Sequence, residues 1–472
     1  MLFDIPLAEK DLPSLLAELS VQEDFFVLGD PAGKVGEDNR WLLFGSLPRE
    51  VLTTKGRRCT WHRPATPPEQ IDDNPMDHLT AWLAGRGVQR PASRKRPFLS
   101  GWVGWLGHDL AWHIEPHLGS HLTAQRAPDD LGLPDLHLGL YHTVWGWDRT
   151  EKRLTVFIDE ELCPEPALSQ RRTCEELVRR AVASGTAMGP HTLGATMAMP
   201  NISRGNYAES IDQILEYIRA GDVYQVNFTH RFGCPFRGDP LGLWWELVHR
   251  HPMPWSAFLE ARGGHLVGNS PECFLRIEGD RLTTRPIKGT APRGETPSQD
   301  ALLMNDLLHS EKDLAEHLMI VDLERNDLGR VAEPGSVRVT DYAQIVTHPT
   351  LHHLVSTIEA RRRPGVTTAQ VLHAMLPGGS VTGAPKARAI EIIDELEPSR
   401  RGFFYGAVGW IDRSGDTALG LAIRTGLMRG NRFELAVGGA IVADSSAIEE
   451  RAEARLKAAA FLGSPDVEAT GP

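Results

Sequence analysis

The sequence predicts an α+β fold in which antiparallel strands, joined in hairpins and meanders, are interspersed with helices. Three observations lead to this prediction. Residues 269–285 contain two β-type runs around a Gly-Asp turn, and residues 403–442 form a meander of three such runs. Helical stretches interrupt these runs without the regular strand–helix alternation of a parallel sheet. The pattern is typical of antiparallel sheets flanked by helices.

The length of the chain predicts more than one lobe. Its 472 residues exceed what one ordinary hydrophobic core accommodates. Residues 185–202 are rich in Gly, Pro, Thr, Ala and Met and show no periodicity, as expected of a boundary. We therefore predict an N-terminal lobe over residues 1–190 and a second lobe over residues 200–463.

Composition and charge narrow the class of protein. The formal charge is −12, so we expect no nucleic-acid partner, because a phosphate-binding surface needs an excess of basic residues. No run of eighteen apolar residues predicts a membrane span, and the N-terminus lacks the pattern of a signal peptide. We therefore expect a cytoplasmic protein without membrane contact.

The five cysteines are scattered along the chain without a CxxC pair. This pattern favours reduced thiols and argues against a zinc site. None of them lies in the tight, glycine-flanked turn that would indicate a glutaminase nucleophile. The cysteines are Cys59, Cys163, Cys174, Cys234 and Cys273.

In the first lobe, short apolar runs separated by polar loops predict strands. Residues 25–29 and 41–45 are the first two. The Gly- and Trp-rich run 98–109 is interpreted as a packed core strand, because glycines allow close backbone approach and tryptophans supply buried area. Residues 136–147 and 154–158 predict a second hairpin.

In the second lobe, apolar residues at helical spacing run from Tyr207 to Ile218, and Gly221 ends this predicted helix. Residues 222–229 alternate as a strand. A long helix is predicted over residues 300–328, and a final helix begins at Ser446 with a capping box.

The hairpin of residues 269–288 contains a possible reactive pair. Its centre lies near residues 279–280, so Glu272 and Lys288 are predicted almost opposite each other. A carboxylate that faces an amine is an arrangement for acid/base and nucleophilic chemistry. The alternative is a cross-strand ion pair on a solvated sheet face.

A second candidate site lies in the meander. Counting across its two turns places Tyr405 opposite Arg424, and Arg424 opposite Gly438. A hydroxyl, a guanidinium and glycine amides in one row of a sheet would bind a carboxylate. The alternative is a surface charge on an edge strand.

Other polar groups give weaker signals. Asp313 and Glu316 share a helix face, but Glu450, Glu453 and Lys457 alone indicate an ordinary solvated face with i,i+4 pairing. A histidine–metal site is improbable, because His352 and His353 point to opposite faces of a strand. The Gly-rich turn of residues 377–388 could hold an anion, but it lacks the pattern of a P-loop, which disfavours nucleotide binding.

Taken together, seven motifs resemble the chorismate-utilising enzymes, a family that includes anthranilate synthase component I, aminodeoxychorismate synthase component I, isochorismate synthase and salicylate synthase. The resemblance covers about residues 200–460 and extends more loosely to residues 101–109. It implies two stacked antiparallel sheets flanked by helices. The motifs are residues 224–227 (YQVN), 270–272 (SPE), 286–290 (PIKGT), 319–330 (MIVDLERNDLGR), 379–386 (GSVTGAPK), 422–425 (AIRT) and 438–445 (GGAIVADS).

Two positions indicate a branch of the family. Anthranilate synthases typically carry Ala at the position of Lys288, and isochorismate and salicylate synthases carry a water-activating Lys at the position of Gln225. Both residues therefore resemble the branch that makes 4-amino-4-deoxychorismate for 4-aminobenzoate and folate biosynthesis. The alternatives are anthranilate synthase component I and a non-catalytic subunit that binds chorismate or tryptophan. Whether the first lobe holds a tryptophan pocket is left as an open question.

The resemblance also implies roles for individual residues. Lys288 would attack C2 of chorismate, and Glu272 would be the acid/base group. Mg²⁺ would be bound by Glu316 and Glu453, with Glu450 and Asp313 holding its waters; the family more often has Glu at position 313. The implied substrate-binding residues are Gly289, Thr290, His353, Ser380, Tyr405, Arg424, Gly438, Gly439, Ala440 and Lys457.

The resemblance implies a partner as well. Amination of chorismate needs ammonia, and no glutaminase signature is visible in the sequence. We therefore expect a separate glutamine amidotransferase subunit that supplies ammonia, and a separate lyase that eliminates pyruvate from the product.

Overall fold

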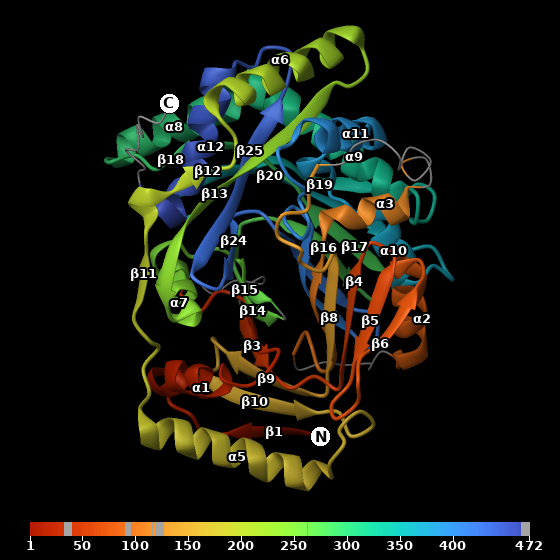
Figure 1. Cartoon of the computed structure of the whole chain (residues 1–472), viewed down its shortest axis with the longest axis vertical. Coiled ribbons are helices and arrows are strands. Elements are labelled where there is room, and N and C mark those ends of the chain that lie inside the picture. Colours follow the sequence, from red (N-terminus) through yellow and green to blue (C-terminus); the bar gives the residue numbers. More distant parts are fainter. Residues whose placement is uncertain (33–39, 90–95, 116–117, 119–126, 262, 464–472) are drawn as a thin grey trace.

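A computed structural model describes residues 1–32, 40–89, 96–115, 118, 127–261 and 263–463 (Figure 1). In these residues the strands form two large antiparallel sheets with helices on their outer sides, so the predicted α+β fold class is confirmed. No helix in these ranges combines the length and the apolar character needed to cross a membrane.

Sheet A has 13 strands among the described residues. In spatial order they are β1 (Leu2–Ile5), β10 (Arg153–Ile158), β9 (Thr143–Asp148), β3 (Trp41–Gly45), β2 (Phe26–Leu28), β14 (Trp255–Ala261), β15 (Gly264–Ser270), β24 (Thr425–Arg429), β25 (Arg432–Ile441), β13 (Gln225–Gly238) and β11 (His191–Leu193), while β12 (Met199–Pro200) and β21 (Gly383–Ala384) also pair with β13.

Sheet B has 12 strands in the same ranges. They are β18 (Ile287–Pro292), β20 (Leu351–Arg361), β17 (Arg281–Arg285), β16 (Cys273–Glu278), β23 (Thr417–Leu421), β22 (Ala407–Asp412), β7 (Gly101–Leu106), β8 (Leu136–Tyr141), β4 (Glu50–Lys55), β5 (Arg58–His62) and β6 (Glu69–Asp72), with β19 (Arg338–Thr347) paired to β20.

Helices cover the outer sides of the sheets. In Figure 1, α5 lies below β1 and β10, α6 lies above the long strands β13 and β25, and α2 and α10 lie beside each other. The helices are α1 (Leu12–Leu19), α2 (Pro75–Arg86), α3 (Ala111–Ile114), α5 (Ala167–Ser184), α6 (Arg204–Ala220), α7 (Pro240–Arg250), α8 (Pro297–His309), α9 (Glu311–Gly329), α10 (Thr368–Met375), α11 (Lys386–Leu396) and α12 (Ala447–Leu462). Short 3-10 helices are η1 (Glu9–Asp11), η2 (His108–Leu110), η3 (Ala195–Met197) and η4 (Gly379–Val381).

Two chain segments pass side by side from one sheet into the other. The first leads from β15 to β16 and the second from β23 to β24. Gly268 pairs with Thr425 in sheet A and Cys273 pairs with Gly420 in sheet B, so the register is kept through the crossing. Strands that switch sheets at a bend form the corners of packed β-sheets.

The crossing corrects two predictions. The meander of residues 403–442 does not lie in one sheet, because β22 and β23 belong to sheet B whereas β24 and β25 belong to sheet A. The predicted run 136–147 is likewise divided between β8 in sheet B and β9 in sheet A. In both cases the residues on either side of the bend are equally β-like, so the sequence pattern does not mark it.

The predicted helix over residues 300–328 is two helices, α8 and α9, with a break at Ser310. Ser310 has extended backbone, and its hydroxyl accepts a hydrogen bond from the N–H of Asp313 at 3.2 Å, which starts the second helix. The predicted helix that begins before Tyr207 is confirmed as α6, and Gly221 ends it at φ 83°.

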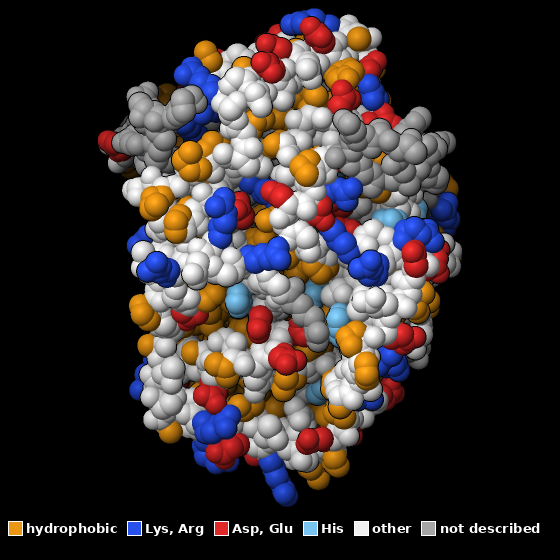
Figure 2. Space-filling view, viewed as in Figure 1, with side chains coloured by type: hydrophobic (Ala, Val, Ile, Leu, Met, Phe, Trp, Pro, Cys, Tyr) orange, Lys and Arg blue, Asp and Glu red, His pale blue; other side chains and the backbone are white. Residues whose placement is uncertain are grey.

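The largest apolar cluster contains side chains from both sheets and from both halves of the chain. Strands from residues 1–190 and from residues 200–463 also share both sheets. The predicted boundary between two lobes, at residues 185–202, stays a prediction. On the face seen in Figure 2, Lys and Arg side chains are interspersed with Asp, Glu and apolar side chains.

Candidate active site

The crossing between the sheets positions two of the predicted site residues. The N–H of Leu421 donates to the backbone oxygen of Glu272 at 3.0 Å, and the N–H of Asn269 donates to that of Arg424 at 2.9 Å. Arg424 has φ 46°, a conformation that costs energy for a non-glycine residue and is often found at functional sites. The bend therefore fixes a carboxyl group and a guanidinium on two adjacent segments.

Glu272 is a buried carboxyl group with a shifted pKa. Burial raises the pKa of Glu272 to about 7, against the opposing effects of the Ser380 hydroxyl and the Lys288 charge. The Ser380 hydroxyl, on η4, donates to Glu272 Oε1 at 2.7 Å. A carboxyl group with a pKa near neutrality can both give and accept a proton at physiological pH.

Lys288 lies on a different strand from the one predicted. The hairpin of β16 and β17 forms, with Glu278 opposite Arg281 and Cys273 opposite Arg285, but Lys288 lies beyond it on β18. Strand β18 pairs with β20 and not with β16, so the predicted cross-strand position opposite Glu272 is wrong.

The two groups nevertheless interact, since each charge affects the pKa of the other. Lys288 is half-buried, and the protein around it lowers the pKa of its ammonium group. The nearby Lys457 lowers this pKa further, whereas Glu316 raises it. A lowered pKa increases the neutral fraction of the amine, which is the nucleophilic form.

Two helices contribute three carboxylates that interact with one another, and the charges of two of them, Glu316 and Glu453, also act on Lys288. Burial raises the pKa of Glu316 on α9, and the charges of Asp313 and Glu453 raise it further. Burial also raises the pKa of Glu450 on α12. For Glu453, burial acts in the same direction, but the Lys457 ammonium at 2.7 Å holds its pKa below the usual value.

The strand β25 approaches these carboxylates closely. A Cβ atom added to Gly439 would lie 3.0 Å from Glu450 Oε2 and 4.0 Å from Glu453 Oε1. Lys457 Nζ donates to the backbone oxygen of Gly438 at 2.8 Å. The pairing of β25 with β24 ends at Leu435, so residues 438–440 are paired on one side only, with β13. This part of the strand can therefore offer backbone groups to a ligand.

The residues present fit a Mg²⁺ ion. In the described part of the chain no three or more metal-ligating side chains gather at one point. Mg²⁺ needs only one or two protein carboxylates, because it keeps several water ligands. Glu450 Oε1 accepts a hydrogen bond from Ser445 at 2.7 Å, while the buried Oε2 has no partner. A cation with its waters would satisfy this oxygen and relieve the repulsion among the carboxylates.

Residues around β18 and β20 complete this side of the site. Thr290 pairs with His353, and His353 Nε2 lies 3.2 Å from Arg424 Nη2. A Cβ atom added to Gly289, which has φ 80°, would lie 3.2 Å from Asp313 Oδ1.

The histidines face different partners, as the strand geometry predicts. His352 Nε2 lies 2.9 Å from Asp300, whereas the ring of His353 lies 5.3 Å from that of His348.

Tyr405 does not lie in one sheet row with Arg424 and Gly438, so this prediction is wrong. Tyr405 lies just before β22 with φ 62°, and its N–H donates to the backbone oxygen of Ala422 at 3.0 Å. The row fails because the chain leaves sheet B after Leu421. Burial raises the pKa of Tyr405, which keeps its hydroxyl protonated.

Sequence reasoning missed a set of buried charged residues that hold the η4 turn. Glu324 Oε1 accepts from the N–H of Gly379 at 2.9 Å. Lys386 donates to the backbone oxygen of Pro377 at 2.8 Å and pairs with Asp327 at 2.5 Å. The Glu397–Arg401 pair lies on the other side of the turn. The i,i+4 spacing of this last pair was the available signal, but it does not distinguish a buried pair from a surface pair.

Comparison with known proteins assigns the chain to a family. Residues 45–463 match the family model described as chorismate binding enzyme. The chain is 39% identical over 416 residues to aminodeoxychorismate synthase component 1 of Klebsiella aerogenes, covering 88% of this chain and 87% of that protein. It is 36% identical over 380 residues to anthranilate synthase component 1 of Acinetobacter calcoaceticus, covering 79% and 76%.

A solved structure shows the same fold. Anthranilate synthase component I from Streptococcus pneumoniae TIGR4 superposes with a TM-score of 0.77 at 27% identity, over 91% of this chain and 93% of that one. The match of the family model includes strands of both sheets and all of the candidate site residues described above. The chain therefore belongs to the chorismate-binding enzyme family and is a chorismate-utilising enzyme of the anthranilate synthase and aminodeoxychorismate synthase group.

Proposed function

We propose that the protein converts chorismate and ammonia to 4-amino-4-deoxychorismate, with Lys288 as nucleophile and Glu272 as acid/base group. The observation that carries this proposal is the pairing of a carboxyl group whose pKa is raised to about 7 with an amine whose pKa is lowered. The raised pKa of Glu272 and the lowered pKa of Lys288 each increase the fraction of the form that the reaction needs. An alanine at position 288, which is typical of anthranilate synthases, would offer no nucleophile.

In the first step the substrate forms a bond to the enzyme at C2 and loses its hydroxyl group at C4. The neutral Lys288 nitrogen bonds to C2, the two ring double bonds shift, and the C4–O bond breaks. Protonated Glu272 gives its proton to the departing hydroxyl, which leaves as water. The carboxylate then takes a proton from the lysine nitrogen, so the adduct is a neutral secondary amine and Glu272 is again protonated.

The second step reverses the shift. Ammonia bonds to C4, the double bonds return, and the C2–N bond to Lys288 breaks. One proton of the new ammonium group passes, through Glu272, to the departing lysine nitrogen. The net reaction is chorismate plus ammonia to 4-amino-4-deoxychorismate plus water, and Lys288 is regenerated.

The remaining residues would orient the substrate. Glu316 and Glu453 would hold Mg²⁺, with Glu450 and Asp313 binding its waters; the ion would neutralise the ring carboxylate of chorismate. Lys457 would assist at the same carboxylate. The residues that bind carboxylates would be Arg424, Tyr405 and the backbone of Gly438, Gly439 and Ala440, and those that line the ring would be Gly289, Thr290, His353 and Ser380.

Ammonia would come from a glutamine amidotransferase subunit. A glutaminase needs a reactive thiolate, and burial raises the pKa of Cys59, Cys163, Cys174 and Cys234, which disfavours that form. The five cysteines, all of which lie in the described part of the chain, form no disulfide bond.

The test is identification of the product and of the adduct. The enzyme is incubated with chorismate and ammonium, with and without Mg²⁺, and the product is identified by mass spectrometry. We expect 4-amino-4-deoxychorismate, and a mass increase on the peptide with Lys288 when ammonium is omitted. Release of fluorescent anthranilate would instead show an anthranilate synthase. Full activity of Lys288→Ala would remove lysine as the nucleophile.

A further inference from the structure

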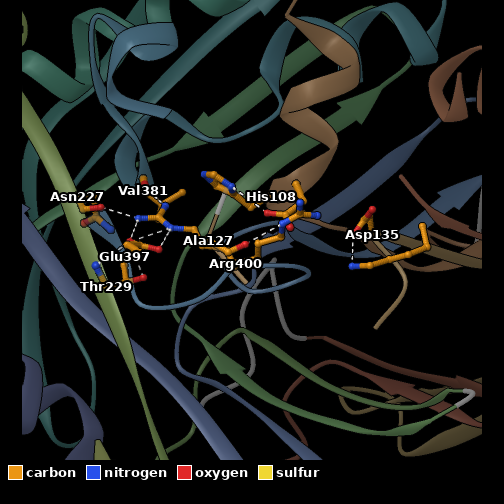
Figure 3. A network of polar contacts seen from close by, with 11 residues as sticks. His108, Ala127, Asp135, Asn227, Thr229, Val381, Glu397 and Arg400 are labelled. Atoms are coloured by element: carbon orange, nitrogen blue, oxygen red, sulfur yellow. Dashed lines mark hydrogen bonds and ion pairs between the residues drawn. The ribbon is translucent and has the colours of Figure 1, made fainter. Parts of the chain in front are cut away.

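A buried ion pair lies beside the site and contacts one of its residues, Tyr405. Arg401 and Glu397 expose 2% and 3% of their side chains. Two guanidinium nitrogens bind the carboxylate. Nε lies 3.2 Å from Oε1 and 3.1 Å from Oε2, and Nη2 lies 2.7 Å from Oε1. Figure 3 shows this network of contacts around Glu397. Such a pair is costly to bury unless its remaining hydrogen-bonding groups are also satisfied.

Those groups are satisfied by two other segments of the chain. Arg401 Nη1 donates to the backbone oxygen of Val381 at 2.6 Å, and Nη2 donates to that of Asn227 at 2.5 Å. Glu397 Oε1 accepts from the N–H and from the hydroxyl of Thr229, both at 2.8 Å. The pair thus ties η4 and β13 to the chain that follows α11, as the dashed contacts in Figure 3 show.

Each of these contacts supports a residue of the proposed site. Val381 follows Ser380, whose hydroxyl donates to Glu272. Thr229 pairs with Gly438 on β25. The guanidinium carbon of Arg401 lies 4.8 Å from the centre of the Tyr405 ring, a cation–π contact. One ion pair therefore supports the positions of Glu272, of the backbone of Gly438 and of the Tyr405 hydroxyl.

The η4 turn is fixed from both ends. Glu324 holds Gly379 and Lys386 holds Pro377, whereas Arg401 holds Val381. Ser380 lies between these anchors. Such buried contacts hold a turn in place, because breaking them would leave buried polar groups unpaired.

We propose that Arg401, held by Glu397, is a positioning residue that keeps Ser380 against the Glu272 carboxyl group and keeps the Tyr405 ring in place for the substrate. The proposal rests on the proposed role of Glu272 as acid/base group. It needs no contact between Arg401 and chorismate. Lysine at position 401 would keep the charge but could not make the forked contacts to Glu397, Val381 and Asn227 at once.

The test compares Arg401→Lys with the parent enzyme in the pH dependence of chorismate consumption. The Ser380 hydroxyl lowers the pKa of Glu272, so its loss raises that pKa. Because the first step needs protonated Glu272, we expect the alkaline limb of kcat/KM to move to higher pH. We also expect kcat/KM at its optimum to fall roughly tenfold, and KM for chorismate to rise, since Tyr405 is released.

Two further variants separate positioning from general stability. Arg413→Lys alters a similar buried pair, in which Arg413 Nη1 lies 2.6 Å from Asp159, in the turn at the far end of β22. It is expected to lower stability but to leave the pH profile and KM unchanged. Ser380→Ala should move the alkaline limb as Arg401→Lys does. The double variant should move it no further, because both changes remove the same contact between Ser380 and Glu272.

The outcomes decide the proposal clearly. Loss of stability in Arg401→Lys with an unchanged pH profile and KM would show a structural role only, and additive shifts with Ser380→Ala would exclude action through Ser380. If Arg401→Lys does not fold, Glu397→Gln, which keeps the side-chain shape, is measured in its place. Chorismate consumption is followed whatever the product, so the formation of anthranilate would contradict the proposed function without deciding the role of Arg401.

Discussion

At Glu272, burial and hydrogen bonding act in opposite directions on one carboxyl group. Burial raises its pKa to about 7, and the Ser380 hydroxyl restrains the rise. The same group therefore links catalysis to stability. The folded protein holds the proton of Glu272 to a higher pH than the unfolded chain does, so ionisation costs the folded state free energy.

The sign of this effect gives a prediction. As pH rises from the ordinary carboxyl pKa of 4.5 to about 7, the folded state loses stability on the order of 3 kcal/mol through Glu272. Glu272→Gln cannot ionise. The free energy of unfolding of this variant, relative to the parent, should therefore increase between pH 5 and pH 8. Urea denaturation at the two pH values measures the difference.

The matched control is Glu278→Gln, at the exposed end of β16, the strand that begins directly after Glu272. Its stability relative to the parent should stay constant over the same range. A constant difference for Glu272→Gln as well would mean that Glu272 is not held in its protonated form.

At the scale of elements, the site is made where α9 presents carboxylates beside β18 and α12 presents carboxylates to β25. The charge of Glu453 on α12 raises the pKa of Glu316 on α9, and β25 contributes Gly439 where a side chain would intrude on Glu450. The absence of a side chain at Gly439 leaves room for the carboxylates of α12 beside β25.

This arrangement predicts the effect of a methyl group. The Cβ of Gly439→Ala would lie 3.0 Å from Glu450 Oε2, so the carboxylate must move. If Glu450 orients water on Mg²⁺, the Mg²⁺ concentration for half-maximal activity should rise roughly tenfold. Titration of activity with Mg²⁺ measures it. Gly329→Ala, where an added Cβ meets nothing within 4 Å, should behave as the parent. An unchanged requirement in Gly439→Ala would argue against Glu450 as a water-binding residue.

At the scale of the whole molecule, the two halves of the chain are built into each other. Strand β22 has β7 as its neighbour, with Ala407 opposite Leu106, and β14 has β2 as its neighbour. Both strands of the second half thus have hydrogen-bond partners in residues 1–190.

We therefore expect that a fragment of residues 200–463 does not fold cooperatively, because it leaves long apolar strand edges unpaired. The full chain should show a sigmoidal thermal transition by circular dichroism, and the fragment should not. Cooperative melting of the fragment, with binding of chorismate, would show instead that the second segment is an independent domain.

Elements with a clear local pattern were predictable from the sequence. Helix α6 has both its period and its cap residues, and the hairpin of β16 and β17 has its turn. The family motifs also brought Lys288, Glu316 and Glu453 together. The sequence did not show where the chain leaves one sheet for the other, since the residues before and after 421–424 are equally β-like. The Tyr405 row and the facing of Lys288 with Glu272 failed because both assumed that a strand continues.

The paired segments at this crossing also limit how the enzyme can move. A hinge motion that parts the two sheets would bend residues 269–272 and 421–424 together and break the contacts between them. Those residues carry the proton donor and the guanidinium of the proposed reaction. Entry of substrate and exit of product must therefore take place through displacement of surrounding loops and helices, while the two sheets keep their mutual orientation throughout the cycle.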